Sequence, residues 1–305
     1  MKAICIPQAG KLHSLELMNI PVPEINDSEV LVQVKTIGVG IQDRWFIPKI
    51  AQYPYAIGIE AAGIIKKVGK AVVHYQPGAL VMFTSSMQPK GGTWAEFAAV
   101  REEALIRIPD GLSFIQAAAL PVAAGTALES MRMLGLRPGD TVFMAGASGA
   151  IGTLTIQMAK ALGCRIAASA SSKNHNYMQS LGAEKTVDYM NPDWISQVKG
   201  WGRGGVDAAL AIQPGTGIGC LDVVKDGGKV VTVSGDQLQT ERGIYVTQVL
   251  VNPETKKALA DLASEVATGH IHVEIEQVYP FELGVEALEK TETRHARGKI
   301  ILTVV

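Results

Sequence analysis

The stretch TVFMAGASGAIGTLTIQMAKALG, residues 141–163, decides the fold of this chain. It opens with β-branched and apolar residues typical of a buried strand, passes through a cluster of small residues, and ends in an apolar pattern of helical period. Gly146, Gly149 and Gly152 lie between the two parts at G-x-x-G-x-x-G spacing. The stretch therefore predicts a strand, a glycine turn and a helix, which is how a βαβ unit begins.

The glycine turn has two possible explanations. The N-terminus of a helix presents unpaired N–H groups and a positive dipole end, so it attracts phosphate, and side chains in the turn would hold a pyrophosphate away. The alternative is a tight turn without a ligand. The G-x-G-x-x-G pattern itself is not met, because Ala147 stands where its first glycine would be. The position of the turn at the head of a long strand–helix series favours dinucleotide binding.

Strand-like and helix-like segments alternate beyond Asp110. We predict strands at 165–170, 185–189, 206–212 and 229–235, helices at 151–163, 174–182 and 217–227, and an edge strand at 244–251. This alternation predicts an α/β domain with a doubly wound parallel sheet over residues 111–251. Residues 1–110 show short strands divided by Gly and Pro, which predicts a separate, mostly β domain. Ser113 is a candidate helix cap, and Pro121 interrupts the helical pattern that follows.

Composition excludes several classes of protein. Only 19% of the 305 residues are charged, the net charge is -1 and no basic run stands out, so nothing indicates nucleic-acid binding. No apolar stretch reaches the length of a membrane span, and the N-terminus lacks the pattern of a secretory signal. Cys5, Cys164 and Cys220 are odd in number and far apart, which indicates buried free thiols in a reducing compartment. We therefore expect a soluble cytoplasmic protein.

The end of the second strand indicates which dinucleotide binds. In this kind of fold an acidic residue about 20 residues after the glycine turn holds the ribose 2′-hydroxyl of NAD. Here the strand at 165–170 ends in Ser171, Ser172 and Lys173, which offer donors and one positive charge but no carboxylate. Such a set suits a 2′-phosphate and favours NADPH. The alternative is a serine helix cap with an exposed lysine.

Seven motifs extend over essentially the whole chain. They are GIEAAGIIKKVG (58–69), GGTWAEFAAV (91–100), LPVAAGTA (120–127), LRPGDTVFMAGASGAIG (136–152), SLGAEKTVDY (180–189), GGVDAAL (204–210) and GKIILTV (298–304). In these motifs and their order the chain resembles the medium-chain dehydrogenase/reductase superfamily, in its zinc-independent branch of quinone and enone reductases that includes zeta-crystallin-like proteins. The resemblance implies a GroES-like β-rich catalytic domain at 1–110, completed by a C-terminal return at 252–305, and a Rossmann domain at 111–251 that binds NADPH.

The resemblance also implies roles for single residues around the cofactor. Thr126 would lie beside the nicotinamide, although a threonine inside a helix often bonds to the backbone instead. Ala150 and Ile151 would donate backbone N–H groups to the pyrophosphate. Tyr189 would pack near the adenosine phosphate and Lys299 near the cofactor phosphates. An ordinary strand-end tyrosine and an exposed lysine are the alternatives for these last two.

On the substrate side the resemblance points to Asp43, Trp45 and Tyr53 at the mouth of the pocket. Core or interface packing is the better explanation for the two aromatic residues. The chain departs from the reductase pattern here, since relatives usually carry Asn, Pro and Asp where this chain has Gly40, Ile57 and Ala211. It is also shorter than typical members, most plausibly around residues 234–243. The substrate class is therefore less constrained than the cofactor.

No catalytic zinc is expected. Zinc-dependent members carry a Cys and a His where this chain has Gly40 and Ile59, and neither glycine nor isoleucine offers a donor atom. The four-cysteine structural zinc lobe is also absent. His270 and His272 point to one face of a possible strand, but they lack a third ligand, so surface or core packing explains them better.

The residues therefore predict hydride transfer from NADPH to a quinone or an α,β-unsaturated carbonyl, an acceptor already activated without a metal. No tyrosine has a lysine four residues later, so the short-chain reductase acid is missing and we assign protonation to water. The alternatives are a non-catalytic NADPH-binding protein, such as a sensor or a crystallin-like protein, and an alcohol dehydrogenase. We expect a homodimer, with the strand at 244–251 pairing with its copy.

The assignment of the 2′-phosphate gives a first prediction. Lys173→Ala should weaken binding of NADPH more than binding of NADH, because only NADPH carries the extra phosphate. Dissociation constants for both cofactors, measured on the same preparations, check it. An equal loss for the two cofactors would contradict the assignment of Lys173.

Overall fold

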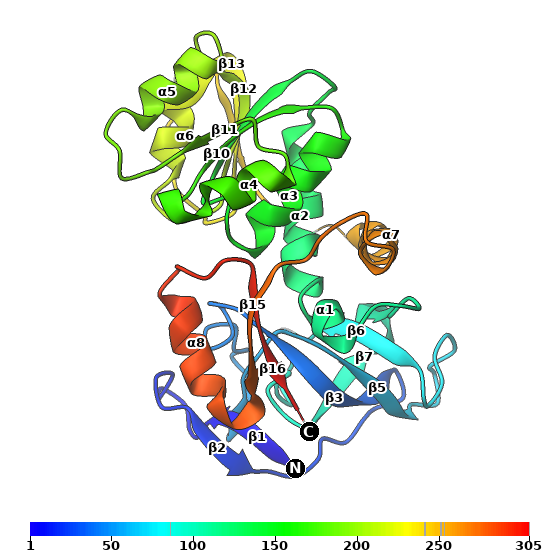
Figure 1. Ribbon diagram of the computed structural model, residues 1–305. Helices are drawn as coiled ribbons and strands as arrows, with labels where there is room; N and C mark the ends of the chain where they lie inside the picture. The colour runs from blue at the N-terminus through cyan, green and yellow to red at the C-terminus, as the bar shows by residue number, and fades with distance from the viewer. Residues whose placement is uncertain (86, 241, 251, 253, 305) are drawn as a thin grey trace. The chain divides into compact units, whose positions relative to one another are not determined.

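The computed structural model describes residues 1–85, 87–240, 242–250, 252 and 254–304, and it separates into two compact units (Figure 1). Unit 1 comprises Met1–Val122, Leu259–His270 and Ile275–Val305. Unit 2 comprises Ala123–Ala258 and Ile271–Glu274. Among the described residues, no helix is both long enough and apolar enough to cross a bilayer.

Unit 2 is built on a six-stranded parallel sheet in the order β11-β10-β9-β12-β13-β14. The glycine-turn strand β9 lies at the centre, with Phe143 opposite Ala167 of β10 and Ala209 of β12. The predicted Rossmann architecture and its edge strand, β14, are confirmed. The strands are β9 (Thr141–Ala145), β10 (Arg165–Ser169), β11 (Lys185–Val187), β12 (Val206–Ala211), β13 (Val224–Thr232) and β14 (Tyr245–Gln248).

Helices cover both faces of this sheet because side chains alternate along each strand. Val142 and Met144 are buried in a cluster with residues of α2, α3 and α4, whereas Phe143 and Ala145 are buried in a second cluster with α5 and α6. Phe143 stacks on Trp194 with ring centroids 5.3 Å apart. The helices are α2 (Pro121–Leu134), α3 (Ala150–Ala161), α4 (His175–Leu181), α5 (Trp194–Trp201) and α6 (Gly217–Val223) (Figure 1).

Two elements of unit 2 differ from the sequence prediction. Helix α5 was not predicted, although Trp194, Val198 and Trp201 recur at helical spacing on its apolar side. The predicted helix at 217–227 ends at Val223, and the chain enters β13 at Val224. Val224 pairs with Val206 of β12, so strand pairing decides this boundary.

Unit 1 is a β-rich unit with two sheets. A seven-stranded sheet follows the order β15-β16-β3-β5-β6-β8, with β7 on β3, and a three-stranded sheet follows β2-β1-β4. The C-terminal strand β16 pairs antiparallel with β3, placing Ile301 opposite Gly38, so the end of the chain completes a sheet begun near its start. The strands are β1 (Lys2–Ile6), β2 (Glu16–Asn19), β3 (Glu29–Val39), β4 (Tyr55–Ala56), β5 (Glu60–Val68), β6 (Leu80–Thr84), β7 (Phe97–Arg101), β8 (Leu105–Arg107), β15 (Ile275–Pro280) and β16 (Lys299–Thr303).

Unit 1 continues past the boundary expected near Asp110, through α1 (Phe114–Ala118) to Val122. The hydroxyl of Thr36 on β3 donates to the carbonyl of Phe114 at 2.7 Å. A Cβ on Gly38 would lie 2.4 Å from the Ala118 carbonyl oxygen, so the helix lies directly against the β3 backbone. As predicted, Ser113 caps α1, forming a capping box with Gln116. The remaining helices are α7 (Thr255–Ala267) and α8 (Gly284–Glu292), with short 3-10 turns η1 (Glu102–Ala104), η2 (Ser172–Asn174) and η3 (Phe281–Leu283).

Candidate functional site

The three glycines of the turn after β9 have three different reasons to lack a side chain. Gly146 has a φ of +77°, a left-handed conformation that favours glycine, and its Cβ would lie 2.5 Å from the Gln213 side chain. Gly152 packs inside the turn, where a Cβ would lie 2.5 Å from the Ala147 backbone. At Gly149 the nearest atom to an added Cβ is 3.8 Å away. The fold itself therefore requires Gly146 and Gly152, whereas an added Cβ at Gly149 would make only an ordinary van der Waals contact.

Helix α3 begins directly after Gly149. Gly149 is the N-cap residue, no side chain caps it, and the first turn contains no acidic residue. Helices α1 and α2 differ from α3, because side chains cap their N-termini. Ser113 caps α1, and a carboxylate oxygen of Glu60 accepts the Val122 N–H at the start of α2 at 2.7 Å. The amides of Ala150 and Ile151 therefore lie at a helix end that no side chain caps. This arrangement fits a pyrophosphate.

The end of β10 brings the predicted 2′-phosphate residues beside this turn. Ser171 precedes the short η2 turn that contains Ser172 and Lys173, and both of these are exposed. Asn174 was missed by sequence reasoning. Its buried side-chain amide donates to the Ser171 hydroxyl at 3.3 Å and to the Ser148 hydroxyl at 3.2 Å, which ties this loop to the glycine turn.

A carboxylate that sequence reasoning missed comes from the neighbouring strand. Asp188, directly after β11, accepts the Ser172 N–H at 3.0 Å and the Met190 N–H at 2.9 Å. The hydrogen bond from the Met190 amide, with those from Ser172, lowers the pKa of Asp188. Tyr189 follows and is 49% exposed. The second strand thus lacks an acid at its end, as the sequence shows, but the third strand supplies one to the same loop.

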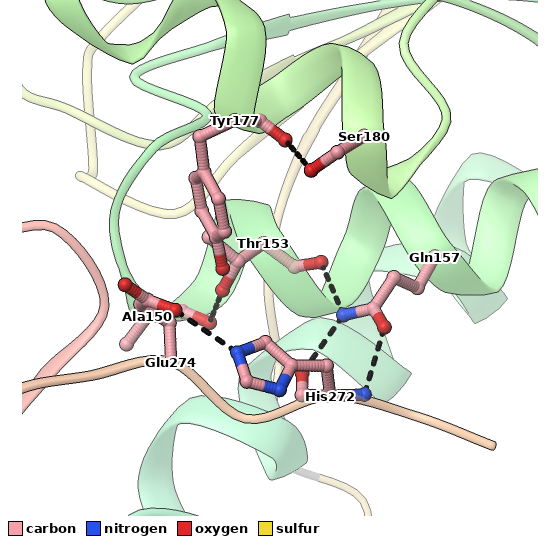
Figure 2. Close-up of polar contacts among 7 residues, drawn as sticks. All are labelled: Ala150, Thr153, Gln157, Tyr177, Ser180, His272 and Glu274. Carbon is pink, nitrogen blue, oxygen red and sulfur yellow. Dashed lines mark hydrogen bonds and ion pairs between the residues drawn. The ribbon is translucent and has the colours of Figure 1, made fainter. Parts of the chain in front are cut away.

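Another face of α3 carries the segment Ile271–Glu274 (Figure 2). The Gln157 side chain accepts the His272 N–H at 2.8 Å and donates to the His272 carbonyl at 2.9 Å. Figure 2 shows the Tyr177 ring pointing from α4 toward Thr153, whose hydroxyl donates to the Ala150 carbonyl at 3.1 Å. The His272 ring pairs with Glu274 at 2.9 Å. The Gln157 side-chain amide therefore bonds both backbone groups of His272 and holds this segment against α3.

The histidines considered as metal ligands have protein partners. His270 lies 2.8 Å from the Thr268 hydroxyl through its Nδ1, and His272 pairs with Glu274. Within the described ranges, no group of three or more His, Cys, Asp or Glu side chains is arranged to hold a metal ion. In the positions where zinc-dependent relatives carry ligands, Gly40 and Ile59 contribute no donor side chain.

In unit 1, Asp43 is buried, with 2% of its surface exposed. Its Oδ2 accepts the Gly40 N–H at 2.9 Å and the indole N–H of Trp94 at 3.1 Å. Burial is the main cause that raises the pKa of Asp43 to about 7, and the nearby charge of Glu60 adds to it, while these hydrogen bonds and Lys299 oppose it. Asp43 thus fixes the turn after β3 to a fully buried tryptophan.

Lys299 and Glu60 form a buried ion pair beside Asp43. Lys299 is 6% exposed and Glu60 1% exposed, and the ammonium donates to Glu60 Oε1. The alternative of an exposed lysine at 299 is therefore wrong, because this side chain is enclosed by unit 1. Its assignment to the cofactor phosphates stays a prediction, but the ammonium group already has a carboxylate partner.

The loop after Asp43 presents aromatic residues to the surface. Arg44 points inward and pairs with Glu292 of α8 at 2.9 Å, which leaves Trp45 and Phe46 each 48% exposed. Tyr53, further along the loop, is 37% exposed. Core packing is therefore not the reason for Trp45 and Tyr53, although Trp45 has an edge contact with His13 at 5.5 Å. Thr126 lies in α2, and its carbonyl accepts the Ser130 hydroxyl at 2.7 Å.

The glycine geometry separates binding from folding. Gly149→Ala should leave the free energy of unfolding within about 1 kcal/mol of the original, because the nearest atom to the added methyl group is 3.8 Å away. It should nevertheless weaken dinucleotide binding at least about tenfold. Gly152→Ala should instead destabilise the fold by about 1–3 kcal/mol through overpacking. Denaturant unfolding and calorimetric titration measure the two effects. Gly200→Ala is the control, since no atom lies within 4 Å of its added Cβ. Unchanged binding in Gly149→Ala would contradict a pyrophosphate at this turn.

The buried Asp43 gives a pH prediction. Its pKa is raised from 3.8 to about 7 in the folded state, so the folded protein binds this proton more tightly than the unfolded chain does. The corresponding stabilisation is complete below about pH 4 and is lost as the pH rises through about 7. Asp43→Asn, which keeps an acceptor for Gly40 and Trp94, should remove a decline on the order of 2–4 kcal/mol over that range. Urea unfolding at several pH values measures it, and an unchanged pH slope in the variant would refute the assignment.

Comparisons with known proteins agree with these features. The family models "Alcohol dehydrogenase GroES-like domain" and "Zinc-binding dehydrogenase" match residues 26–110 and 181–302. The chain is 34% identical over 197 residues to "Trans-enoyl reductase tazE" of Aspergillus terreus, a match covering 58% of this chain and 65% of that protein, less than two thirds of its length.

Two further comparisons cover nearly the whole chain. It is 30% identical over 327 residues to "NADPH-dependent alkenal/one oxidoreductase, chloroplastic" of Arabidopsis thaliana, covering 99% of this chain and 79% of that protein. The solved structure of the quinone oxidoreductase from Coxiella burnetii matches with a TM-score of 0.89 and 28% identity, covering 100% of this chain and 99% of that one. The glycine turn, the parallel sheet and these similarities together show that the chain belongs to the medium-chain dehydrogenase/reductase superfamily.

Proposed function

We propose that this protein is an NADPH-dependent reductase of quinones or α,β-unsaturated carbonyl compounds that works without zinc. The observation that carries the proposal is the start of α3, where no side chain caps the helix, the first turn has no acidic residue, and the N-cap residue Gly149 has no side chain to cover the backbone amides. A pyrophosphate supplies the negative charge and the acceptors that this helix end lacks. The similarity to proteins named as NADPH-dependent alkenal/one and quinone oxidoreductases supports the activity.

The loop after β10 supports NADPH over NADH. Ser172 and Lys173 are exposed, so their hydroxyl and ammonium groups can reach a 2′-phosphate. Asp188 is the one carboxylate bonded to this loop among the described residues, and it already accepts two backbone amides. These two amides stabilise the negative charge of Asp188. Lys173, which follows Ser172 in the sequence, supplies a positive charge in the same loop. Tyr189, half-exposed at the end of β11, is a candidate for the adenosine side.

The lack of metal-ligand atoms at residues 40 and 59 of unit 1 favours a substrate that accepts hydride without activation by a metal. Gly40 and Ile59 bring no ligand atom, while Asp43 is bonded to Gly40 and Trp94, and Glu60 to Lys299 and Val122. Bound NADPH would supply the hydride. The protein's own residues then bind and orient, with Thr126 at the nicotinamide end and Ala150 and Ile151 at the pyrophosphate. A quinone or conjugated enone accepts hydride without a metal, whereas a simple carbonyl usually needs polarisation.

The exposed loop residues Trp45 and Tyr53 are proposed to line the substrate mouth, next to the buried Asp43. We assign the proton that follows hydride transfer to water. We also propose a homodimer formed through β14, the edge strand of the unit 2 sheet, and a cytoplasmic location consistent with the three buried free thiols.

A single assay separates the proposal from its alternatives. Purified protein mixed with NADPH should consume it when a quinone or an enone is added, followed at the absorbance band of the reduced nicotinamide. The same rate is expected after dialysis against a chelator, since the site offers no zinc ligands at residues 40 and 59. Cofactor binding without turnover would favour a non-catalytic NADPH-binding protein. Alcohol oxidation restored by added zinc would favour an alcohol dehydrogenase.

A further inference from the structure

The buried Glu60 carboxylate has two partners, one at each oxygen. Its Oε1 accepts from the Lys299 ammonium, and its Oε2 accepts the Val122 N–H at 2.7 Å. Val122 is the second residue of α2, so Glu60 caps this helix from a position 62 residues earlier in the sequence. A carboxylate at a helix N-terminus is favoured by the dipole and satisfies one of the unpaired amides.

The capped helix carries a proposed cofactor residue. Thr126 lies four residues, about one helical turn, after Val122 on the same helix, α2 (Pro121–Leu134). Disorder in the first turn of α2 would be transmitted to Thr126 through the helix backbone. Lys299 contributes by giving Glu60 a partner charge, because a lone carboxylate at 1% exposure would be costly.

We propose that Glu60 and Lys299 are positioning residues, which hold the first turn of α2 so that Thr126 is in place for the nicotinamide end of the cofactor. This inference rests on the proposed function. It gives Lys299 a different role from a phosphate ligand: its ammonium group serves Glu60. Without the cap, part of the protein would have a frayed first turn, and binding would have to order it, which lowers the apparent affinity.

The test must avoid leaving a buried charge without its partner, because that alone destabilises a protein. The variants E60Q/K299M and E60M/K299M both remove the ion pair and have side chains of similar size. They differ in one feature, since the glutamine amide oxygen can still accept the Val122 N–H and the methionine cannot. Loss of a cap corresponds to about a fivefold change. We therefore expect E60M/K299M to bind NADPH about fivefold more weakly than E60Q/K299M, measured by fluorescence titration.

A double-mutant cycle shows whether the effect passes through Thr126. With T126V added to both variants, the fivefold difference should disappear, because the hydroxyl that needs positioning is gone. S113A is the matched control: it removes the cap of α1 and should not change NADPH affinity. Circular dichroism during heating verifies that each variant folds. If E60M/K299M does not fold, E60D carries the test, since it keeps both charges and withdraws the carboxylate from Val122.

The outcomes are distinct. Equal affinities in E60Q/K299M and E60M/K299M would overturn the inference, and so would a difference that persists in the T126V background. For E60D, affinity equal to that of the original protein would overturn it. Absence of NADPH binding by the original protein would instead refute the proposed function itself.

Discussion

The amides at the start of α3 are the feature on which the proposed site depends. A helix N-terminus leaves backbone N–H groups without intrahelical partners, and the chain provides no side-chain cap at Gly149. Every surrounding contact keeps this end accessible: Gly146 makes the turn, Gly152 lets the helix approach Ala147, and the Ala147 N–H is held by the Ser169 carbonyl at 3.0 Å. Backbone contacts thus define the turn, and Gly149, which is half-buried, precedes the first amides of the helix.

In unit 1, by contrast, the buried charged side chains have partners within the protein. Asp43 is bonded to Gly40 and Trp94, Arg44 to Glu292, and Glu60 to both Lys299 and Val122. The four charged side chains Asp43, Arg44, Glu60 and Lys299 are buried, and each has protein partners. Charges inside a protein are tolerated only when paired and hydrogen-bonded, so this cluster is suited to holding backbone and helix positions. The residues left on the surface of the same loop, Trp45, Phe46 and Tyr53, are aromatic, and two of them, Trp45 and Tyr53, are those proposed to line the substrate mouth.

The elements of the Rossmann unit could be predicted from sequence because they depend on local patterns. Buried parallel strands read as continuous apolar runs, and the glycine turn joins one such run to a helix of regular period. Prediction failed where the local pattern was weaker. Helix α5, whose apolar residues are interspersed with polar ones, was not predicted. The end of α6 at Val223 was also not predicted, because it is set by the pairing of Val224 with Val206. Ser113 was identified as a cap because a capping box is contained within four residues.

The partners of the functional side chains could not be predicted in this way. Lys299 and Glu60 are 239 positions apart in sequence, and Asp188 reaches Ser172 from the next strand, so only the folded sheets bring them together. Sequence by itself determined the α/β class, the glycine turn and the residue types available for a dinucleotide. Only the fold shows that Lys299 pairs with Glu60, that Glu60 accepts the Val122 N–H at the start of α2, and that Asp188 accepts the Ser172 N–H after β10. The reason is physical: periodicity and turn chemistry act between neighbouring residues, whereas the partner of a buried charge is chosen by whichever strand or helix packs against it.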